Sequence, residues 1–307
     1  MSSAESYISH GPSTEMKESK MNKIESHVNR GLSVRARRVI AYAVLVFFTA
    51  LCLIWFYILL INSTRSHAEM TRGFTVLPST HVLENWQNLV NGTIPIAKGF
   101  VNSITVSVLV SVLSVYFSAM TAYAVNTYRF KGREAVAAFI LAIMMIPGQV
   151  TILGFIQLIN KLGMDDTIWP LIIPTIAAPI TYFYFRQYMA SNLPMSLVEA
   201  ARIDGSGEFR TFNTIILPLI KPAISVQLIF SFVGSWNNYF TPALILHTDT
   251  KKTLPVLLAQ LRGADWLRFD MGQIYIMIAA SIFPVIVIYL FLSKYIVGGV
   301  TAGAVKG

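Results

Sequence analysis

Six uncharged apolar runs dominate the sequence and restrict what the chain can fold into. They cover residues 39–61, 100–125, 135–159, 168–185, 222–246 and 271–293, and none contains Asp, Glu, Lys or Arg. A helix needs about 20 residues to cross the hydrocarbon of a bilayer, whereas a membrane barrel would show shorter segments of alternating polarity. The runs therefore predict an all-α membrane protein with six transmembrane helices. The fourth run carries three prolines, which membrane helices tolerate where neighbouring groups satisfy the backbone.

The distribution of charge predicts how these helices are oriented. Only 13% of the residues are charged, about half the share that is usual in soluble domains. With the N-terminus inside, the cytoplasmic segments hold 16 of the 24 Lys and Arg residues, and the sequence RARR at 35–38 adjoins the first run. Lys and Arg favour cytoplasmic loops, so we expect both termini in the cytoplasm. The net charge of +9 then reflects membrane orientation, and no nucleic-acid partner is expected.

The regions outside the runs differ in composition. Residues 1–38 are rich in Ser, Lys and Glu, which predicts a flexible cytoplasmic tail. The run at 39–61 is too long for a signal peptide and is expected to remain as the first helix. A short surface helix is expected around 83–90. The remaining segments are a polar external segment at 62–98, a core of five helices at 99–295 and a cytoplasmic C-terminal tail at 296–307.

Small residues recur every three or four positions along the second run. They are Ser103, Ser107, Ser111, Ser114, Ser118 and Ala122. This spacing places them on one stripe of a helix. Such stripes let helices approach closely in lipid, which favours a helix-packing face. A pore-lining face is the alternative.

A polar passage at 194–218 separates the fourth run from the fifth. Its first part, 195–204, has a helix-forming composition and is opened by Pro194. Gly205 is expected to end this helix in a left-handed conformation. Glu199 and Arg202 are three residues apart and can form an ion pair.

The second part of the passage predicts another short helix. Ser206 is suited to its N-cap, and Phe209, Phe212 and Ile216 recur at helical spacing on one side. Pro218 is expected to stop this helix before the fifth run. The whole passage is therefore predicted to form a helix-turn-helix on the cytoplasmic surface.

The same passage contains the pattern E-A-A-x3-G-x9-I-x-L-P. Its specified positions are Glu199, Ala200, Ala201, Gly205, Ile215, Leu217 and Pro218. The pattern matches the signature of bacterial ATP-binding-cassette importer permeases, so the chain resembles this family. The resemblance implies a type I importer permease fold in which 194–218 is a coupling segment that docks into a cleft of an ATPase subunit. Arg202 and Asp204 are expected to share that contact.

Other segments resemble one branch of this family, the carbohydrate-uptake permeases related to the smaller subunit of the maltose permease. They are MMIPGQVTIL at 144–153, WNNYFTPALIL at 236–246 and the C-terminal YIVGGVTAGAVKG. The resemblance implies a multi-pass protein of the bacterial inner membrane. It also implies a second permease subunit, two ATP-binding subunits, an extracytoplasmic solute-binding protein and a sugar substrate. In the C-terminal tail, Thr301, Ala302, Gly303 and Lys306 are expected to contact the ATPases.

No chemistry is expected from this chain itself. It has no G-x-x-x-x-G-K-[ST] phosphate loop, so ATP and Mg are expected on the partner subunits and no cofactor on this one. The five histidines are scattered without ligand spacing, which argues against a metal site. An intramembrane enzyme is the alternative from another class, but the runs hold no histidine and no carboxylate for catalysis.

Uncharged runs favour a neutral solute, because intramembrane charge usually marks an ionic pathway. The same architecture with a solute other than a sugar is the alternative within transport. Amides and aromatic side chains are the expected contacts of a sugar. Candidates are Gln149, Gln227, Trp236, Asn237, Asn238 and Tyr239, for which interhelical hydrogen bonding and interfacial packing are equally open roles.

Overall fold

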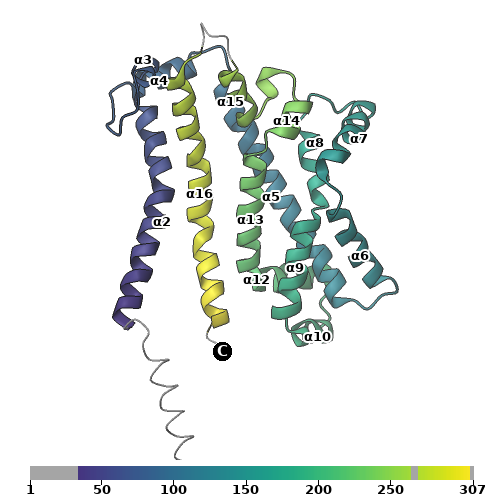
Figure 1. Ribbon diagram of the computed structural model, residues 1–307. Coiled ribbons are helices and arrows are strands. Elements are labelled where there is room, and N and C mark those ends of the chain that lie inside the picture. The colour runs from purple at the N-terminus through teal and green to yellow at the C-terminus, as the bar shows by residue number, and fades with distance from the viewer. Residues whose placement is uncertain (1–33, 264–268, 305–307) are drawn as a thin grey trace, which may run out of the picture. The chain divides into compact units, whose positions relative to one another are not determined.

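The computed structural model describes residues 34–263 and 269–304, and every regular element in these two ranges is helical (Figure 1). The predicted all-α class is therefore confirmed. The chain divides into two compact units, residues 1–58 and 59–307, and each is described by itself. Most of the tail predicted at 1–38 lies outside the described residues, and the first helix already begins at Val34.

Three helices are long and apolar enough to cross a membrane singly. They are α2 (Val34–Ser63), α5 (Ile96–Thr127) and α16 (Met271–Ala304), of which Met271–Tyr295 meets this test. They contain the first, second and sixth predicted spans. At about 1.5 Å of rise per residue, each exceeds the roughly 30 Å of bilayer hydrocarbon. The backbone of α16 is helical to Ala304, so a helix occupies most of the segment expected as a C-terminal tail.

The third run does not form one straight helix. It is divided into α6 (Arg133–Met144) and α7 (Gly148–Lys161), which meet at 96°. The break follows from Pro147, which lacks an N–H, fixes its own φ and disfavours helical geometry in the residue before it. Pro147 is extended, with φ −60° and ψ 125°. The pair forms a broken span or a re-entrant loop.

The fourth run is also interrupted, so the single helix expected at 168–185 is wrong. Its parts are α8 (Trp169–Ile172), the 3-10 turn η1 (Ile173–Ile176) and α9 (Pro179–Asn192). Ala177 and Ala178 leave helical geometry between η1 and α9, with ψ of 79° and 91°. Pro179 explains this because it disfavours helical geometry at the preceding residue.

The fifth run forms α13 (Lys221–Trp236) and α14 (Phe240–Ile245), separated by a short non-helical link. The described residues thus hold three single-helix spans, or up to five if each bent pair is one span, where six were expected. The second bent pair joins residues 208–219 to α13 at 83°. Proline breaks account for the difference, because an uncharged run can be longer than the helices inside it.

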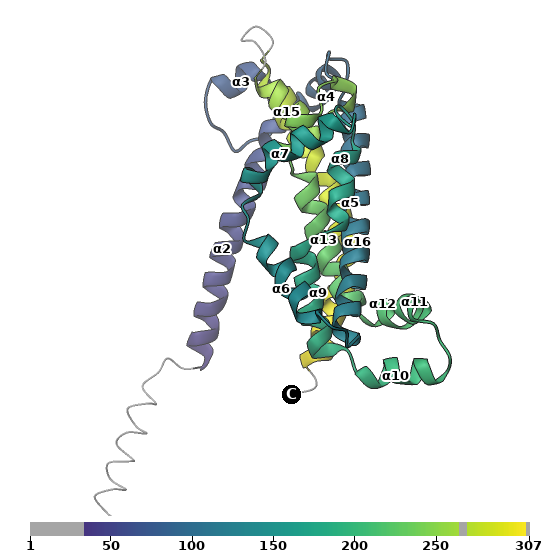
Figure 2. The ribbon, with the colours of Figure 1, turned by 90° about the vertical axis from the view of Figure 1, so that its right-hand side faces the viewer.

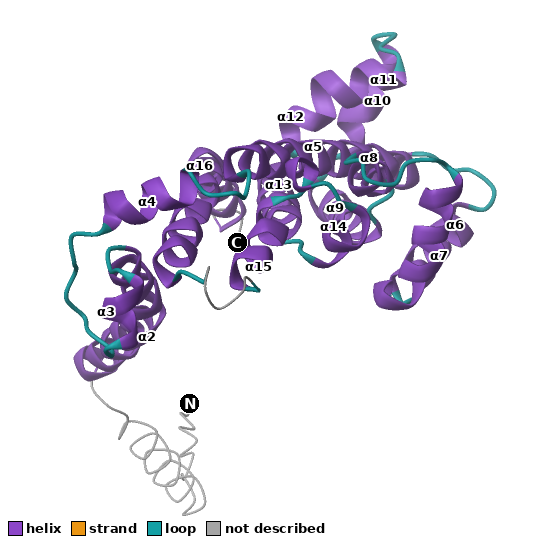
Figure 3. Cartoon of the chain, turned by 90° about the horizontal axis from the view of Figure 1, so that it is seen from above, coloured by secondary structure: helices purple, strands orange, loops and turns teal. Residues whose placement is uncertain are grey.

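Helix α5 is central to the second unit. It packs against α9 and α13, and α13 packs in turn against α16 (Figures 1 and 3). The six small residues of its stripe are all buried. Two of them bond across helices, since Ser118 Oγ donates to the Ala178 carbonyl at 3.2 Å and Ser103 Oγ accepts from Leu254 N at 2.7 Å. The helix-packing interpretation of the stripe is therefore correct for these positions.

Short helices gather at one end of the second unit. They are α3 (His67–Thr71), α4 (Val82–Val90), η3 (Asp249–Lys251) and α15 (Leu254–Arg262). The structure thus confirms the short helix expected around 83–90. Helix α4 packs against α16, and α15 packs against α5 and α16. Figure 2 shows α3, α4 and α15 near one end and α10 near the other.

Candidate functional site

Residues 194–219 project from the helices of the second unit (Figures 2 and 3). The first part is α10 (Met195–Ile203), which ends in a Schellman motif, the double hydrogen bond that closes many helix C-termini. Ser206 N donates to the Ala201 carbonyl at 2.9 Å, and Gly205 N donates to the Arg202 carbonyl at 3.0 Å. Gly205 has φ +73°, as the sequence predicted. The chain turns back at this glycine because a left-handed residue is needed there.

The second part begins at Glu208, one residue later than the predicted cap would place it. Helix α11 spans Glu208–Thr211, and its N-cap is Gly207, which has no side chain to offer. The expectation that Ser206 caps this helix is therefore wrong. Ser206 Oγ instead accepts a hydrogen bond from Thr211 Oγ1 at 2.9 Å. That bond ties the turn to the end of α11.

The helical segment that begins with α11 continues through Pro218, so the expectation that Pro218 stops it is wrong. The π-helical turn η2 (Phe212–Ile216) and α12 (Leu217–Leu219) follow it. In η2 the Leu217 N–H reaches back five residues to the Phe212 carbonyl. A π turn is an insertion of one residue in a helix. Here only Leu217 separates it from Pro218, which has no N–H to donate. The bend comes only after Leu219.

One face of the projecting segment is buried and the other presents apolar side chains. Val198 and Ala201 are buried, and so are Phe212 and Ile216. Phe209 was expected to share their face, but its side chain is 69% exposed. At the end of α10, Ile203 is 87% exposed. The two exposed side chains flank the turn at Gly205.

An ion pair closes the turn from the polar side. Arg202 Nε lies 2.8 Å from Glu208 Oε1, so Arg202 pairs with Glu208 and not with Glu199 as expected. Tyr123 of α5 donates its hydroxyl to Glu208 Oε2 at 3.2 Å, and the Arg202 guanidinium lies 5.5 Å from the centre of the Tyr128 ring. The hydrogen bond to Glu208 raises the pKa of Arg202. These contacts tie the turn to the last turn of α5.

The other predicted ATPase contacts are distributed as follows. Glu199, Ala200, Asp204 and Pro218 are exposed, and Ile215 and Leu217 are half-buried. In the C-terminal segment, Thr301, Ala302 and Gly303 belong to α16, and only their backbone is described. Lys306 lies outside the described residues. The signature motif did not reveal Glu208, because this residue falls in the unspecified gap between Gly205 and Ile215.

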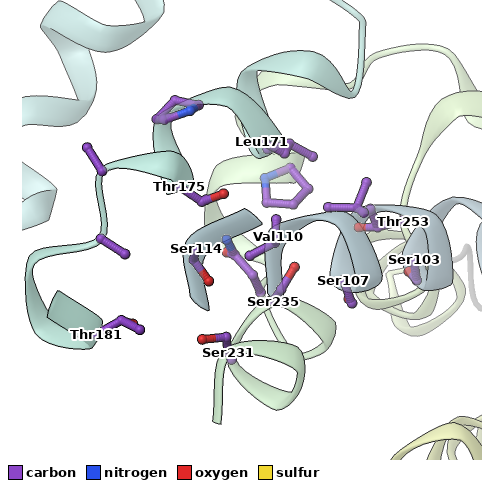
Figure 4. Close-up of a pocket in the computed structure, with 17 residues that line it drawn as sticks. Ser103, Ser107, Val110, Ser114, Leu171, Thr175, Thr181, Ser231, Ser235 and Thr253 are labelled. Carbon is purple, nitrogen blue, oxygen red and sulfur yellow. The ribbon is translucent and has the colours of Figure 1, made fainter. Parts of the chain in front are cut away.

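A cavity of about 410 Å³ that is partly open to the surface lies in the second unit, between α5, the α8–α9 break, α13 and the start of α15 (Figure 4). No charged side chain lines it. Its hydroxyl-bearing residues are Ser103, Ser107, Ser114, Thr175, Thr181, Ser231, Ser235 and Thr253. Three of these belong to the serine stripe, so the stripe both packs helices and faces a cavity.

Of the six predicted solute contacts, the structure brings only Asn238 to this cavity. Trp236 is buried, stacks on Phe232 at 5.8 Å and donates Nε1–H to the Ser281 carbonyl at 3.1 Å, which makes it a packing residue between α13 and α16. The other four do not line the cavity: Gln227 is buried, and Gln149, Asn237 and Tyr239 are exposed. In the sequence, the stripe of serines indicated where the cavity lies. The amide side chains did not, because only one of them lines it.

Asp166 joins two loops at the end of the unit that holds α15. Its carboxylate accepts hydrogen bonds from the backbone of His247 and Thr248, from the Thr248 hydroxyl at 2.6 Å and from Lys251 Nζ at 2.9 Å. The bonds from Thr248 and Lys251 hold the pKa of Asp166 well below its usual range. Asp166 has φ +53°, a conformation that Asp tolerates better than most residues. The described residues contain no cluster of potential metal ligands.

Comparison with known proteins decides the family. A family model described as the inner-membrane component of binding-protein-dependent transport systems matches residues 114–301. The chain belongs to this family. This permease is 35% identical over 274 residues to the arabinooligosaccharides transport system permease protein AraQ of Bacillus subtilis, covering 86% of this chain and 95% of AraQ. It is 36% identical over 210 residues to the trehalose/maltose transport system permease protein MalG of Thermococcus litoralis, covering 67% and 74% of the two chains.

The permease also resembles a solved structure. A chain of a bacterial ABC transporter involved in the import of the acidic polysaccharide alginate superposes with a TM-score of 0.75. The match covers 87% of this permease and 99% of that chain, at 23% sequence identity. At this level of identity the likeness supports the fold. The overall arrangement of the helices therefore matches a fold that is already known from a solved structure.

Proposed function

We propose that this permease is one translocation subunit of an ATP-driven importer of carbohydrates. The main observation behind this proposal is the exposed turn around Gly205, which presents the family signature on a segment that projects from the helical body. The relatives AraQ and MalG are named as permeases for arabinooligosaccharides and for trehalose/maltose, which supports a sugar as the solute. We place the protein in the bacterial inner membrane with six spans and both termini in the cytoplasm.

The importer needs further subunits. A second permease would complete the pore, and an extracytoplasmic solute-binding protein would deliver the sugar. Two ATPase subunits would bind ATP and Mg, since this chain has no phosphate loop. The solved alginate transporter has been described in complex with its pentasaccharide-bound periplasmic protein, which supports a binding-protein partner.

The geometry of the turn suggests how an ATPase would engage it. Exposed Ile203 and Phe209 offer apolar area for a cleft, and burying a large apolar side chain contributes about 1.5–3 kcal/mol. Ala200 has almost no side chain, which allows a partner backbone to approach closely. Glu199 remains available for a basic group of the ATPase. In the C-terminal segment, Thr301, Ala302, Gly303 and Lys306 are proposed as a second ATPase contact.

Movement of the docked turn would reach the pore through α5. The Arg202–Glu208 pair spans the turn, and Glu208 is bonded to Tyr123 of α5. A displacement of α10 and α11 would therefore act on the same helix that lines the cavity. Alternating access would follow from this coupling, without any covalent step on the permease.

Reconstitution tests the proposal. The permease, its partner permease, both ATPases and the binding protein are assembled in lipid vesicles, and uptake of neutral oligosaccharides is measured with and without ATP. We expect ATP-dependent uptake only when the binding protein is present. ATP hydrolysis by the assembled complex without uptake of any oligosaccharide would contradict a sugar importer.

A further inference from the structure

We infer that the cavity between α5, the α8–α9 break and α13 is a binding subsite for a neutral, polyhydroxylated ligand, held by the hydroxyls of Ser107 and Thr253. The inference rests on the proposed function, because it assigns a sugar contact to this subunit. About 410 Å³ falls within the range of about 300–1,000 Å³ that is usual for small-molecule sites.

Two buried hydroxyls in the cavity wall have no partner in the described part of the chain. Ser107 is 1% exposed and Thr253 is 4% exposed, and both Ser107 Oγ and Thr253 Oγ1 lack a hydrogen bond. Buried polar groups are nearly always hydrogen-bonded, and leaving a buried hydroxyl without a partner is unfavourable. Hydroxyls of a ligand in the cavity would supply the missing partners.

The neighbours of Ser107 show that its hydroxyl is an exception. Ser111 donates to the Val108 carbonyl at 3.0 Å, and Ser114 donates to the Ser111 carbonyl at 3.3 Å. Such bonds to the preceding turn are the usual solution for serine inside a helix. Ser107 forms no such bond, although the same helical carbonyls run beside it.

Thr253 departs from expectation in a second way. It is the N-cap residue of α15, where a threonine hydroxyl normally accepts a backbone N–H of the first turn. No side-chain cap bond is present, and Pro255, the second residue of α15, has no N–H to offer the Thr253 hydroxyl. Ser103 Oγ accepts the Leu254 N–H. The Thr253 hydroxyl has no partner, and Thr253 lines the cavity together with Ser107 (Figure 4).

The backbone around the cavity points to the same use. The non-helical residues Ala177 and Ala178 line it, as does Asn238 in the link between α13 and α14. At membrane depth, non-helical backbone is tolerated only where it is buried in protein or faces a polar cavity. The interruptions of the fourth and fifth runs therefore meet at one place.

The chemistry of the lining selects the ligand class. Hydroxyls and one amide can donate and accept hydrogen bonds, and the intervening aliphatic side chains can cover the apolar faces of a sugar ring. None of the described residues that line the cavity is a cation, so a carboxylate or phosphate would lose water there without gaining an ionic partner, which is unfavourable. We therefore assign the site to neutral sugars rather than to acidic ones.

The test removes both hydroxyls with little change in volume. Ser107→Ala and Thr253→Val are combined in the permease, which is purified as the assembled complex with its partner permease and ATPases. Binding of radiolabelled arabinotriose and maltotriose is measured in lipid nanodiscs without the binding protein. A trisaccharide of alginate serves as the acidic probe. Ser111→Ala is the matched control, because Ser111 lies on the same buried stripe but does not line the cavity.

Two lost hydrogen bonds of about 1 kcal/mol each predict a Kd for a neutral trisaccharide at least about tenfold weaker in the double variant. The Ser111→Ala complex should bind like the wild type, and the alginate trisaccharide should bind at least tenfold more weakly than the neutral sugar. Equal Kd values for the double variant and the wild type would overturn the inference. So would the absence of trisaccharide binding to the wild-type complex.

Thermal stability separates a ligand site from a structural role. Removing hydroxyls that have no partner should leave the melting temperature of the sugar-free complex unchanged or raised. A clear fall would mean that the hydroxyls hold the helices together through water, and it would overturn the inference. Uptake by the wild-type complex with its binding protein is measured in parallel. If uptake occurs and the double variant binds sugar normally, only the subsite fails; if no sugar is taken up, the proposed function fails as well.

Discussion

Arg202 Nε and Glu208 Oε1 lie 2.8 Å apart across the turn at Gly205. The pair joins the end of α10 to the start of α11, and the Tyr123 hydroxyl connects Glu208 to α5. Both partners are more than one third exposed, so solvent screens the pair and it contributes little to folding. The proposed role of the ion pair is to keep α10 and α11 in one orientation relative to each other.

Glu208→Gln is therefore expected to uncouple rather than unfold the permease. The amide keeps the shape of the side chain but removes the charge that holds Arg202. We expect assembly and ATP hydrolysis to persist while transport per ATP falls several-fold in vesicles. Arg210→Gln is the control, because Arg210 is an exposed residue of α11 and the substitution also removes one charge. Equal coupling in both variants would show that the ion pair has no part in transmission.

The Asp166 clamp is expected to respond to pH. The native pKa of Asp166 lies below the ordinary value of 3.8, so its contribution is present above that pH and is lost as the pH falls through the native pKa. Asp166→Asn should lower the melting temperature by roughly 2–4 °C for each kcal/mol of clamp energy. The difference from the wild type should be constant above about pH 5 and shrink in stronger acid. A difference that stays constant down to pH 3 would contradict the ionic clamp.

The segment 247–251 supplies every partner of that carboxylate, and we propose that it faces the binding protein. Its deletion should reduce the stimulation of ATP hydrolysis by the binding protein while the subunits still assemble. Asp166→Asn should have the same effect to a smaller degree, because the loop is loosened but present. Loss of assembly in the deletion variant would assign the segment to folding instead.

Gly272 permits a close contact between α16 and α4. A Cβ at this position would collide with the side chain of Asn85, whose Nδ2 donates to the carbonyls of Ser63 and Arg65. Overpacking of this kind costs about 1–3 kcal/mol, so Gly272→Ala should lower the melting temperature of the complex. Gly154→Ala is the control, since Gly154 lies within α7 and a Cβ added to it would meet no heavy atom within 4 Å. It should be neutral or stabilising.

The orientation of the spans can be checked with reporter insertions. Lys252 precedes α15 and is expected outside, whereas Arg129 follows α5 and is expected inside. Alkaline phosphatase inserted after Lys252 should be active, and the same enzyme inserted after Arg129 should be inactive. The reverse pattern would overturn the proposed topology.

The sequence allows the local backbone conformation to be predicted where a single residue determines it. Gly205 was predicted to end α10 with positive φ, and the structure confirms it. The breaks at Pro147 and at Ala177–Ala178 were missed, because hydropathy is continuous across them. A proline in an apolar run is compatible with either a kink or a break, and the packing of neighbouring helices decides between them.

The candidate sites were predictable only in part for a related reason. The signature located the coupling segment, but it could not show that Arg202 would choose Glu208 over Glu199. Glu199 and Glu208 are both close enough in sequence to pair with Arg202. The contact of Glu208 with Tyr123, however, depends on tertiary folding. Likewise, the cavity combines residues from α5, α9 and α13, and the serine stripe alone gave only its α5 side.

The central claim is that the projecting turn is a rigid coupling element, and substitutions of Gly205 test it. Its φ of +73° strains a residue with a Cβ by about 1 kcal/mol or more, and most strongly a β-branched one. Apart from the two chain neighbours of Gly205, no heavy atom of the described residues lies within 4 Å of a Cβ placed there, so space among them is not the constraint. Asn tolerates the left-handed conformation, which makes Gly205→Asn the matched partner of Gly205→Val.

The decisive measurement is the number of sugar molecules transported per ATP hydrolysed by reconstituted complexes that carry these two variants. We expect Gly205→Val to insert, assemble and hydrolyse ATP with little uptake, and Gly205→Asn to retain most of the wild-type coupling. Wild-type coupling in Gly205→Val would contradict the claim, because the turn would then only connect two helices.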